Sequence, residues 1–168
     1  MIPASRQRNY LQAALYVVIA GVVATVLLEK LLTYAEAAEK ASVEATVSRL
    51  NSAMYARLAL LVLRGEQQAV GALETESPFR IAHAESPAYL GEFDGQPPEV
   101  DGGKWYFDRS RRELVYLPNL KRYLQAEDEA GLAPASISFR TEVRKSATGA
   151  YSGVVLVPAS PWRWDPRP

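Results

Sequence analysis

The hydrophobic and polar positions of the chain change their pattern near residue 28. Residues 9–28 contain no charged side chain and are apolar nearly throughout. At a helical rise of about 1.5 Å per residue this stretch spans about 30 Å, the thickness of the hydrocarbon core of a bilayer. A secretory signal peptide usually has a shorter apolar stretch that ends at small residues, whereas here the helical pattern runs on through Glu29 and Lys30. The pattern therefore predicts a retained transmembrane helix over residues 9–30.

The predicted helix continues as an amphipathic segment over residues 31–65. It contains no proline, and no glycine before Gly65, so we expect one helix from about Tyr10 to Arg64. Its larger apolar residues recur every three or four positions, which places them on one face of the helix. We predict that this face forms a helix–sheet core with the rest of the chain: Val43, Val47, Leu50, Met54, Leu58 and Leu61.

Four strands are predicted after the helix, and the first two form a hairpin. A strand that begins at Lys104, a turn over residues 108–112 and a strand over residues 113–117 predict a β-hairpin. Apolar and polar residues alternate over residues 137–144, which predicts a strand with one wet face. Residues 151–157 are predicted to form the last strand.

Other segments lack a strand pattern. Residues 66–73 are predicted to form a short helix, and residues 86–103 a loop, because they are rich in proline, glycine and acidic residues. Residues 120–125 have no clear assignment, and residues 127–134 are expected to form a loop. The tail, residues 158–168, contains four prolines and is not expected to extend the sheet as a regular strand.

These elements predict an α+β fold in which a long N-terminal helix packs on an antiparallel sheet of about four strands. The helix needs a cover for its apolar face, and the sheet needs one for its own. We expect residues 31–65 to extend the membrane helix, residues 66–157 to form the globular domain, and residues 158–168 to form a separate tail.

Charge and composition limit the classes of partner. Lysine and arginine balance aspartate and glutamate at nineteen each, so the total charge does not indicate a nucleic-acid partner. The chain has no cysteine, which excludes disulfides and thiolate chemistry. Arg6 and Arg8 precede the apolar run, and acidic residues such as Glu29 and Glu36 follow it. The positive-inside rule then predicts that residues 1–8 are cytoplasmic and that the rest lies across the membrane, in the periplasm.

Candidate chemical groups are sparse. His83 is the only histidine, so a surface histidine is expected rather than a zinc ligand. Glu92, Asp94, Glu99 and Asp101 could ligate calcium, but their spacing fits no standard calcium loop. The chain has no nucleophile elbow and no phosphate-binding glycine loop. We therefore expect no enzyme, no metal, no cofactor and no small-molecule substrate.

Two pairs of residues are candidates for contacts with other proteins. Gly21 and Ala24 present small side chains in the membrane helix, which lets another helix approach closely in lipid. Trp162 and Trp164 bracket Arg163 in the tail. Exposed aromatic residues beside an arginine often anchor interfaces, so these two could contact a partner. The alternative is that the tail folds back over the sheet.

The layout resembles the type IV pilins and the type II secretion pseudopilins, in which an N-terminal helix packs on an antiparallel sheet. Residues 41–47 (ASVEATV) resemble the helix region of the family. Residues 87–92 (PAYLGE) and 103–116, with Trp-Tyr-x-Asp and Leu-x-Tyr, are similar to its loop and hairpin patterns.

The N-terminus departs from the family pattern. Precursors in the family carry a basic leader that ends in glycine, followed by phenylalanine and by glutamate at the fifth mature position. Alignment on Gln7 and Arg8 places Asn9 at the glycine, Tyr10 at the aromatic residue and Ala14 at the glutamate. The resemblance then implies that the prepilin peptidase leaves the chain uncut, with a mature protein that begins at or close to Met1.

The same departure implies an accessory role. The family's buried glutamate is thought to pair with the terminal amine of a neighbouring subunit, which offsets the cost of a charge in lipid, and alanine makes no such pair. The family's tip-capping minor pseudopilin also lacks the glutamate, so a tip position remains open.

The resemblance therefore implies a single-pass inner-membrane protein that serves in assembly, priming or anchoring of a type IV pilus or a type II secretion machine. Its expected partners are membrane lipid and other pilin-like or inner-membrane subunits. The alternative is a bitopic envelope scaffold, unrelated to pilins, that pairs through its helix with another membrane protein. A membrane-tethered hydrolase is a third class, but the sequence contains no recognisable catalytic constellation.

Overall fold

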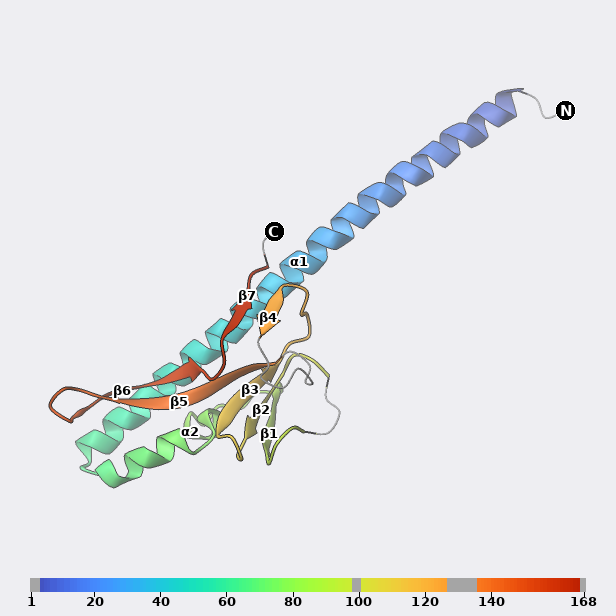
Figure 1. Cartoon of the computed structure of the whole chain (residues 1–168). Helices are drawn as coiled ribbons and strands as arrows, with labels where there is room; N and C mark the ends of the chain where they lie inside the picture. The colour runs from blue at the N-terminus through green and yellow to red at the C-terminus, as the bar shows by residue number, and fades with distance from the viewer. Residues whose placement is uncertain (1–3, 98–100, 127–135, 167–168) are drawn as a thin grey trace.

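The computed structural model describes residues 4–97, 101–126 and 136–166. The predicted loop over residues 127–134 lies outside the described residues. The first element is a helix of 60 residues, α1 (Ala4–Leu63), which extends from the globular part as a long rod (Figure 1). The prediction of one continuous helix through the apolar run and the amphipathic segment is confirmed.

Gly65 ends α1 as predicted. Its backbone has a φ of 73°, a left-handed conformation that glycine adopts without the steric cost of a Cβ. The Gly65 N–H donates to the carbonyl of Val62 at 3.1 Å, and the Glu66 N–H donates to the carbonyl of Leu61 at 2.9 Å. These two hydrogen bonds form a Schellman motif, which satisfies carbonyls that the end of the helix would leave unpaired.

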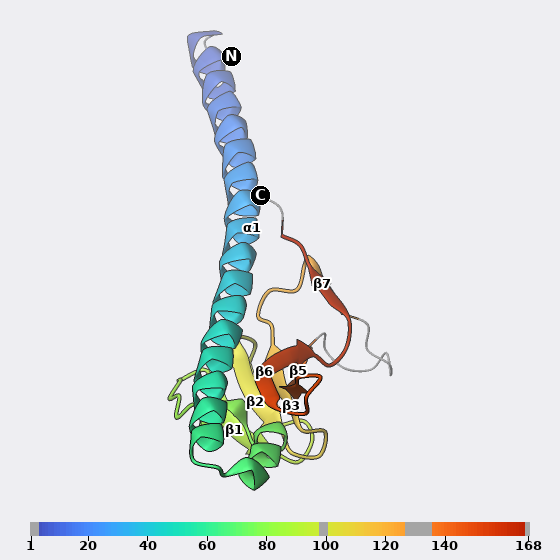
Figure 2. The same cartoon turned by 90° about the vertical axis from the view of Figure 1, so that its left-hand side faces the viewer.

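A five-stranded sheet covers one side of the C-terminal half of α1 (Figure 2). The strands follow the order β1-β2-β3-β5-β6. Strands β2, β3, β5 and β6 are paired antiparallel, while β1 pairs parallel with β2. The fold is therefore α+β, as predicted, with a mixed sheet. The strands are β1 (Tyr89–Phe93), β2 (Lys104–Asp108), β3 (Glu113–Leu117), β5 (Ile137–Lys145) and β6 (Tyr151–Pro158).

Strand β1 lies in the segment that the sequence predicts to be a loop, so the loop prediction is wrong there. The strand is short and irregular: its register with β2 shifts between Tyr89 and Glu92, and Gly91 has a φ of 109°. The irregularity hides the alternation that marks a strand. Its partner β2 is the next strand along the chain, but the parallel pairing leaves no local signal in the sequence.

A second sheet of two strands joins segments for which the sequence predicts no strand. Strand β4 (Leu124–Ala126) comes from the unassigned residues, and β7 (Trp162–Trp164) from the tail. They pair antiparallel, with Leu124 opposite Trp164. The tail does not extend the five-stranded sheet, as predicted, but it is not a separate segment: it returns beside α1.

The predicted helix–sheet core is confirmed. Val43, Leu50, Met54, Leu58 and Leu61 are buried in one cluster, and Val47 packs against it. The sheet contributes the side chains of β2 and β3 that face α1, together with residues of β5 and β6. Two short helical segments complete the core: η1 (Gln67–Glu74) and α2 (Pro78–Ile81). Segment η1 is a 3₁₀ helix and lies where the sequence predicts a short helix over residues 66–73.

The edge of the sheet at β6 is held to α1 by a side chain. The Leu156 N–H donates to Asn51 Oδ1 at 2.8 Å. An edge strand otherwise presents unpaired N–H groups to other chains, and this hydrogen bond occupies one of them.

Candidate functional site

Residues 12–32 of α1 are exposed on all sides. Tyr16 and Val17, for example, are each 71% exposed, although side chains of this kind are normally buried. The helix is long and apolar enough to cross a membrane, and no part of its most apolar window is buried within the molecule. A core helix of a soluble domain would be mostly covered. This part of α1 is therefore compatible with a membrane anchor.

The small residues of the apolar run are open to neighbours. A Cβ added at Gly21 would meet no atom within 4 Å, and Ala24 is exposed. Ala14, which the predicted alignment places at the glutamate of the pilins, is also exposed. Asn9 and Tyr10 lie within α1, but their side chains are outside the described residues.

A row of carboxylates lies at the base of the exposed half. Glu29, Glu36 and Glu39 continue the buried face of α1 toward the N-terminus, since positions seven and three apart share one face of a helix. We call these three residues the carboxylate row. In the sequence they indicate only the charge that follows the apolar run, but in the structure each of them binds a segment of the globular part.

Glu39 binds the end of strand β3. Its Oε1 accepts hydrogen bonds from Tyr116 Oη at 2.7 Å and from the Asn119 N–H at 2.6 Å, and its Oε2 accepts one from the Leu120 N–H at 3.0 Å. Burial, followed by this hydrogen bond and the charge of Glu39, raises the pKa of Tyr116. Glu39 thus accepts hydrogen bonds from two backbone N–H groups that follow the end of β3.

Glu36 binds the second sheet. Its side chain is buried, and its Oε1 accepts hydrogen bonds from the Tyr123 N–H at 2.9 Å and from Trp164 Nε1 at 2.8 Å. A buried carboxylate is tolerated when charge-assisted hydrogen bonds replace its water. This one residue therefore fastens both the approach to β4 and the end of β7 to the helix.

Glu29 completes the row at the edge of the apolar run. Its Oε1 lies 3.1 Å from Arg122 Nη2. One turn later, Thr33 Oγ1 lies 3.5 Å from Tyr123 Oη. The spacing of the row extends the apolar stripe of α1 with polar residues, which marks the face of the helix but not the groups that the carboxylates bind.

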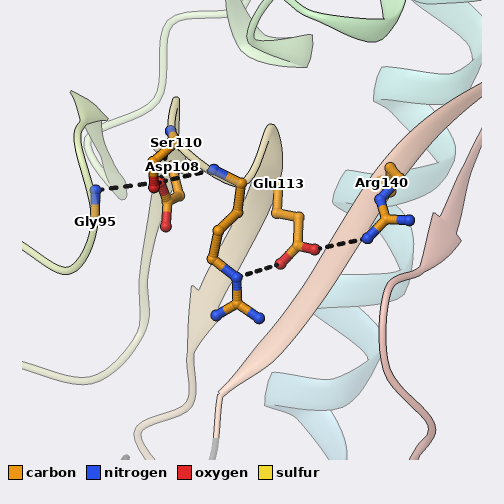
Figure 3. A network of polar contacts seen from close by, with 6 residues as sticks. Gly95, Asp108, Ser110, Glu113 and Arg140 are labelled. Carbon is orange, nitrogen blue, oxygen red and sulfur yellow. Dashed lines mark hydrogen bonds and ion pairs between the residues drawn. The ribbon is translucent and has the colours of Figure 1, made fainter.

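A second polar network holds the tip of the β2–β3 hairpin (Figure 3). Asp108 Oδ1 accepts hydrogen bonds from Ser110 Oγ at 2.6 Å and from the N–H groups of Ser110, Gly95 and Arg111 at 2.9, 3.1 and 3.2 Å. Burial by itself raises the pKa of Asp108, but these hydrogen bonds lower it by more, so the pKa lies below its usual value. The network joins the turn to the loop after β1 and is structural.

Glu113 stands beside this network, and its side chain is 4% exposed. It pairs with Arg140 at 3.0 Å and with Arg111 at 3.5 Å (Figure 3). Both arginines reach in from the surface, so the buried carboxylate is neutralised without a ligand from outside.

Trp162 and Trp164, the two predicted partner contacts in the tail, both pack in or against the core of the molecule. Trp164 is 2% exposed and belongs to the main core, so the prediction that it contacts a partner is wrong. Trp162 is partly buried and packs edge-on against Phe139, with ring centroids 6.3 Å apart. The alternative prediction, that the tail folds back over the sheet, describes what the structure shows. The reason is that Glu36 offers the indole N–H of Trp164 a buried acceptor.

The candidate metal ligands lie apart or are paired with arginines. Glu92 lies 3.5 Å from Arg80, and Asp94 lies 2.7 Å from Arg109. Glu99 is outside the described residues. His83 is exposed. Within residues 4–97, 101–126 and 136–166, no three carboxylate or imidazole groups come together in a way that could hold a metal ion.

Comparisons of the chain with protein-family models, with curated proteins and with solved structures found no significant match. The residues and their geometry therefore carry the functional argument.

Proposed function

We propose that the chain is a pilin-like, single-pass inner-membrane protein that acts as a minor or accessory subunit of a type IV pilus or a type II secretion machine. The division of α1 into two halves carries this proposal. Residues 12–32 of the helix expose apolar side chains on every side, while its C-terminal half packs on a mostly antiparallel sheet. Such a helix holds a folded domain at a membrane and leaves an apolar surface for neighbouring helices in lipid.

An accessory role is favoured over that of a major subunit. Ala14 stands where the resembling family has its glutamate, and a methyl group cannot pair with the terminal amine of a neighbour. In this proposal the chain serves in assembly, priming or anchoring, and its partners are membrane lipid and other pilin-like or inner-membrane subunits.

Deletion of the chain in its own cells tests the role. We expect lower filament yield or lower secretion, and we expect the chain in sheared filaments at a small fraction of the major subunit. Levels equal to those of the major subunit would contradict the accessory role. Unchanged assembly and secretion would favour the alternative of a bitopic envelope scaffold unrelated to pilins.

The small residues Gly21 and Ala24 allow a sharper test of how the chain acts. Replacement of Gly21 and Ala24 together by leucine keeps the helix apolar but prevents close approach of another helix. We expect this double variant to insert normally and to fail to restore assembly in the deletion strain. Val23→Leu, also in the exposed apolar run, is the matched control and should restore it.

A further inference from the structure

The end of the globular part that lies nearest to the apolar half of α1 contains the β4–β7 sheet and the residues before it. In both views β7 runs alongside α1 toward the N-terminal end of the helix (Figures 1 and 2). The contacts of Arg122 with Glu29 at 3.1 Å and of Tyr123 with Thr33 at 3.5 Å fix this end against the first turns after the apolar run. We call it the membrane-proximal end.

The depth of these contacts follows from the helical rise. Glu29 and Thr33 lie about 2 and 8 Å beyond Leu28 along the helix axis, at about 1.5 Å per residue. The headgroup layer on each side of a bilayer is about 5–8 Å thick. If α1 crosses the membrane, Arg122 and Tyr123 therefore lie at the level of the headgroups.

Four basic side chains are exposed at this end, although the sequence after the apolar run is acidic. The carboxylates of Glu36 and Glu39 turn inward to N–H and O–H donors of the globular part. Lys30 and Lys121 are exposed, and neither forms an ion pair with any residue in the described part of the chain.

Two arginines add to this basic surface. Arg122 is exposed, and its guanidinium lies over the ring of Tyr123, 5.5 Å from the centroid, which holds it in place beside Glu29. Arg163 is exposed on β7 and lies 3.6 Å from Asp165. Exposed ion pairs of this kind are weak, so both guanidinium groups keep N–H donors for a phosphate.

We infer that the membrane-proximal end rests on the headgroup layer of the same membrane that α1 crosses, with Lys30, Lys121, Arg122 and Arg163 bound to the phosphates of anionic lipids. Lysine and arginine bind phosphate through charge-assisted hydrogen bonds, and tyrosine is enriched at this depth. The inference rests on the proposed membrane anchor. It adds that the globular domain has one fixed orientation on the lipid surface.

Lipid-headgroup quenching tests the contact. The chain has no cysteine, so a single introduced cysteine takes a fluorophore at one known place. Gln125→Cys places it on β4, and Ala147→Cys, at the exposed turn between β5 and β6, is the matched control far from the apolar half of α1 (Figure 1). The full-length protein is reconstituted into vesicles of phosphatidylcholine with phosphatidylglycerol that contain a lipid with a nitroxide on its headgroup.

We expect the fluorophore at position 125 to be quenched several-fold more than the one at position 147. Lys121→Gln with Arg163→Gln should reduce this difference, since each basic residue near an anionic surface strengthens binding by about five-fold. Vesicles made of phosphatidylcholine without phosphatidylglycerol should reduce the difference in quenching in the same way. The unfolding midpoint of the double variant should match that of the parent, because both side chains are exposed.

The outcomes separate this inference from the anchor. Protein that floats with the vesicles, but whose two fluorophores are quenched equally, would keep the anchor and overturn the headgroup contact. Quenching at position 125 that depends neither on anionic lipid nor on the two basic residues would overturn the assignment of the phosphate ligand. Protein that does not float with vesicles would overturn the anchor, and the headgroup contact with it.

Discussion

Leu58 and Leu63 lie five positions apart on one helix, yet they are 3% and 83% exposed. Leu58 lies in the helix–sheet core, whereas Leu63 is in the last turn of α1 and faces water. Burial of a leucine side chain stabilises a fold by roughly 2 kcal/mol, and its loss from a core adds the cost of a cavity. The position of a leucine around the helix axis, rather than its identity, decides its contribution to stability.

The first prediction compares these two leucines. Leu58→Ala should lower the free energy of unfolding by roughly 2–5 kcal/mol, while Leu63→Ala should change it by less than about 0.5 kcal/mol. Denaturant unfolding of the full chain in detergent, followed by tryptophan fluorescence, measures both. Equal effects of the two substitutions would contradict the packing of α1 on the sheet.

Asp108 supports a prediction about acid stability. Its folded pKa lies below the usual value of 3.8, so its contribution to stability is present above about pH 4 and is lost as the pH falls through the folded pKa. Asp108→Asn should lower the free energy of unfolding at pH 7 by about 2 kcal/mol, because neutral acceptors bind N–H donors less strongly. The difference between the two proteins should shrink as the pH drops below 4. A difference that stays constant down to pH 2 would show that the charge of Asp108 does not matter.

At the scale of elements, α1 combines three kinds of surface along its length. The first is apolar and exposed, the second is the carboxylate row, and the third is the apolar stripe of the core. The carboxylate row lies where the helix leaves the cover of the five-stranded sheet. There it replaces apolar packing by hydrogen bonds to the backbone of residues 119–123 and to β7. The second sheet therefore depends on α1 for its position.

Glu36→Ala should release this second sheet. It removes the acceptor of the Trp164 indole and of the Tyr123 N–H, at a cost on the order of 3 kcal/mol, since donors left without a partner in a buried site are costly. Glu44→Ala is the matched control: Glu44 is exposed and lies 3.7 Å from Lys40, a surface pair worth little. Unfolding measurements and amide hydrogen exchange at residues 123–126 and 162–164 would report the release. Unchanged exchange in the Glu36 variant would contradict the role of the carboxylate row.

At the scale of the whole molecule, the apolar half of α1 and the globular part lie at opposite ends of one rod (Figure 1). If the rod crosses a membrane, the globular part must lie wholly on one side. Arg6 and Arg8 lie before the apolar run, and we expect them to keep the N-terminus in the cytoplasm.

Protease treatment of spheroplasts tests this topology. A tag at the C-terminus should be removed, and a tag at the N-terminus should be protected until the membrane is broken. A C-terminal tag that resists protease in intact spheroplasts, but not after lysis, would show that the orientation is the reverse of the predicted one.

The sequence by itself determined α1, its end at Gly65, the residues of the helix–sheet core and four of the strands. These features depend on interactions that are local or periodic: an apolar run, a stripe at helical spacing, a left-handed glycine and alternation along a strand. Such patterns repeat within the element that they specify, so they can be recognised without knowledge of what the element packs against.

Only the tertiary structure decided the parallel pairing of β1, the β4–β7 sheet, the burial of Trp164 and the inward direction of the carboxylate row. Most of these features depend on a few contacts between residues far apart in the chain, such as that of Glu36 with Trp164. A single long-range hydrogen bond leaves no periodic signal in either segment. For that reason the acidic residues after the apolar run indicated only charge in the sequence, while in the fold they hold the globular part to the helix.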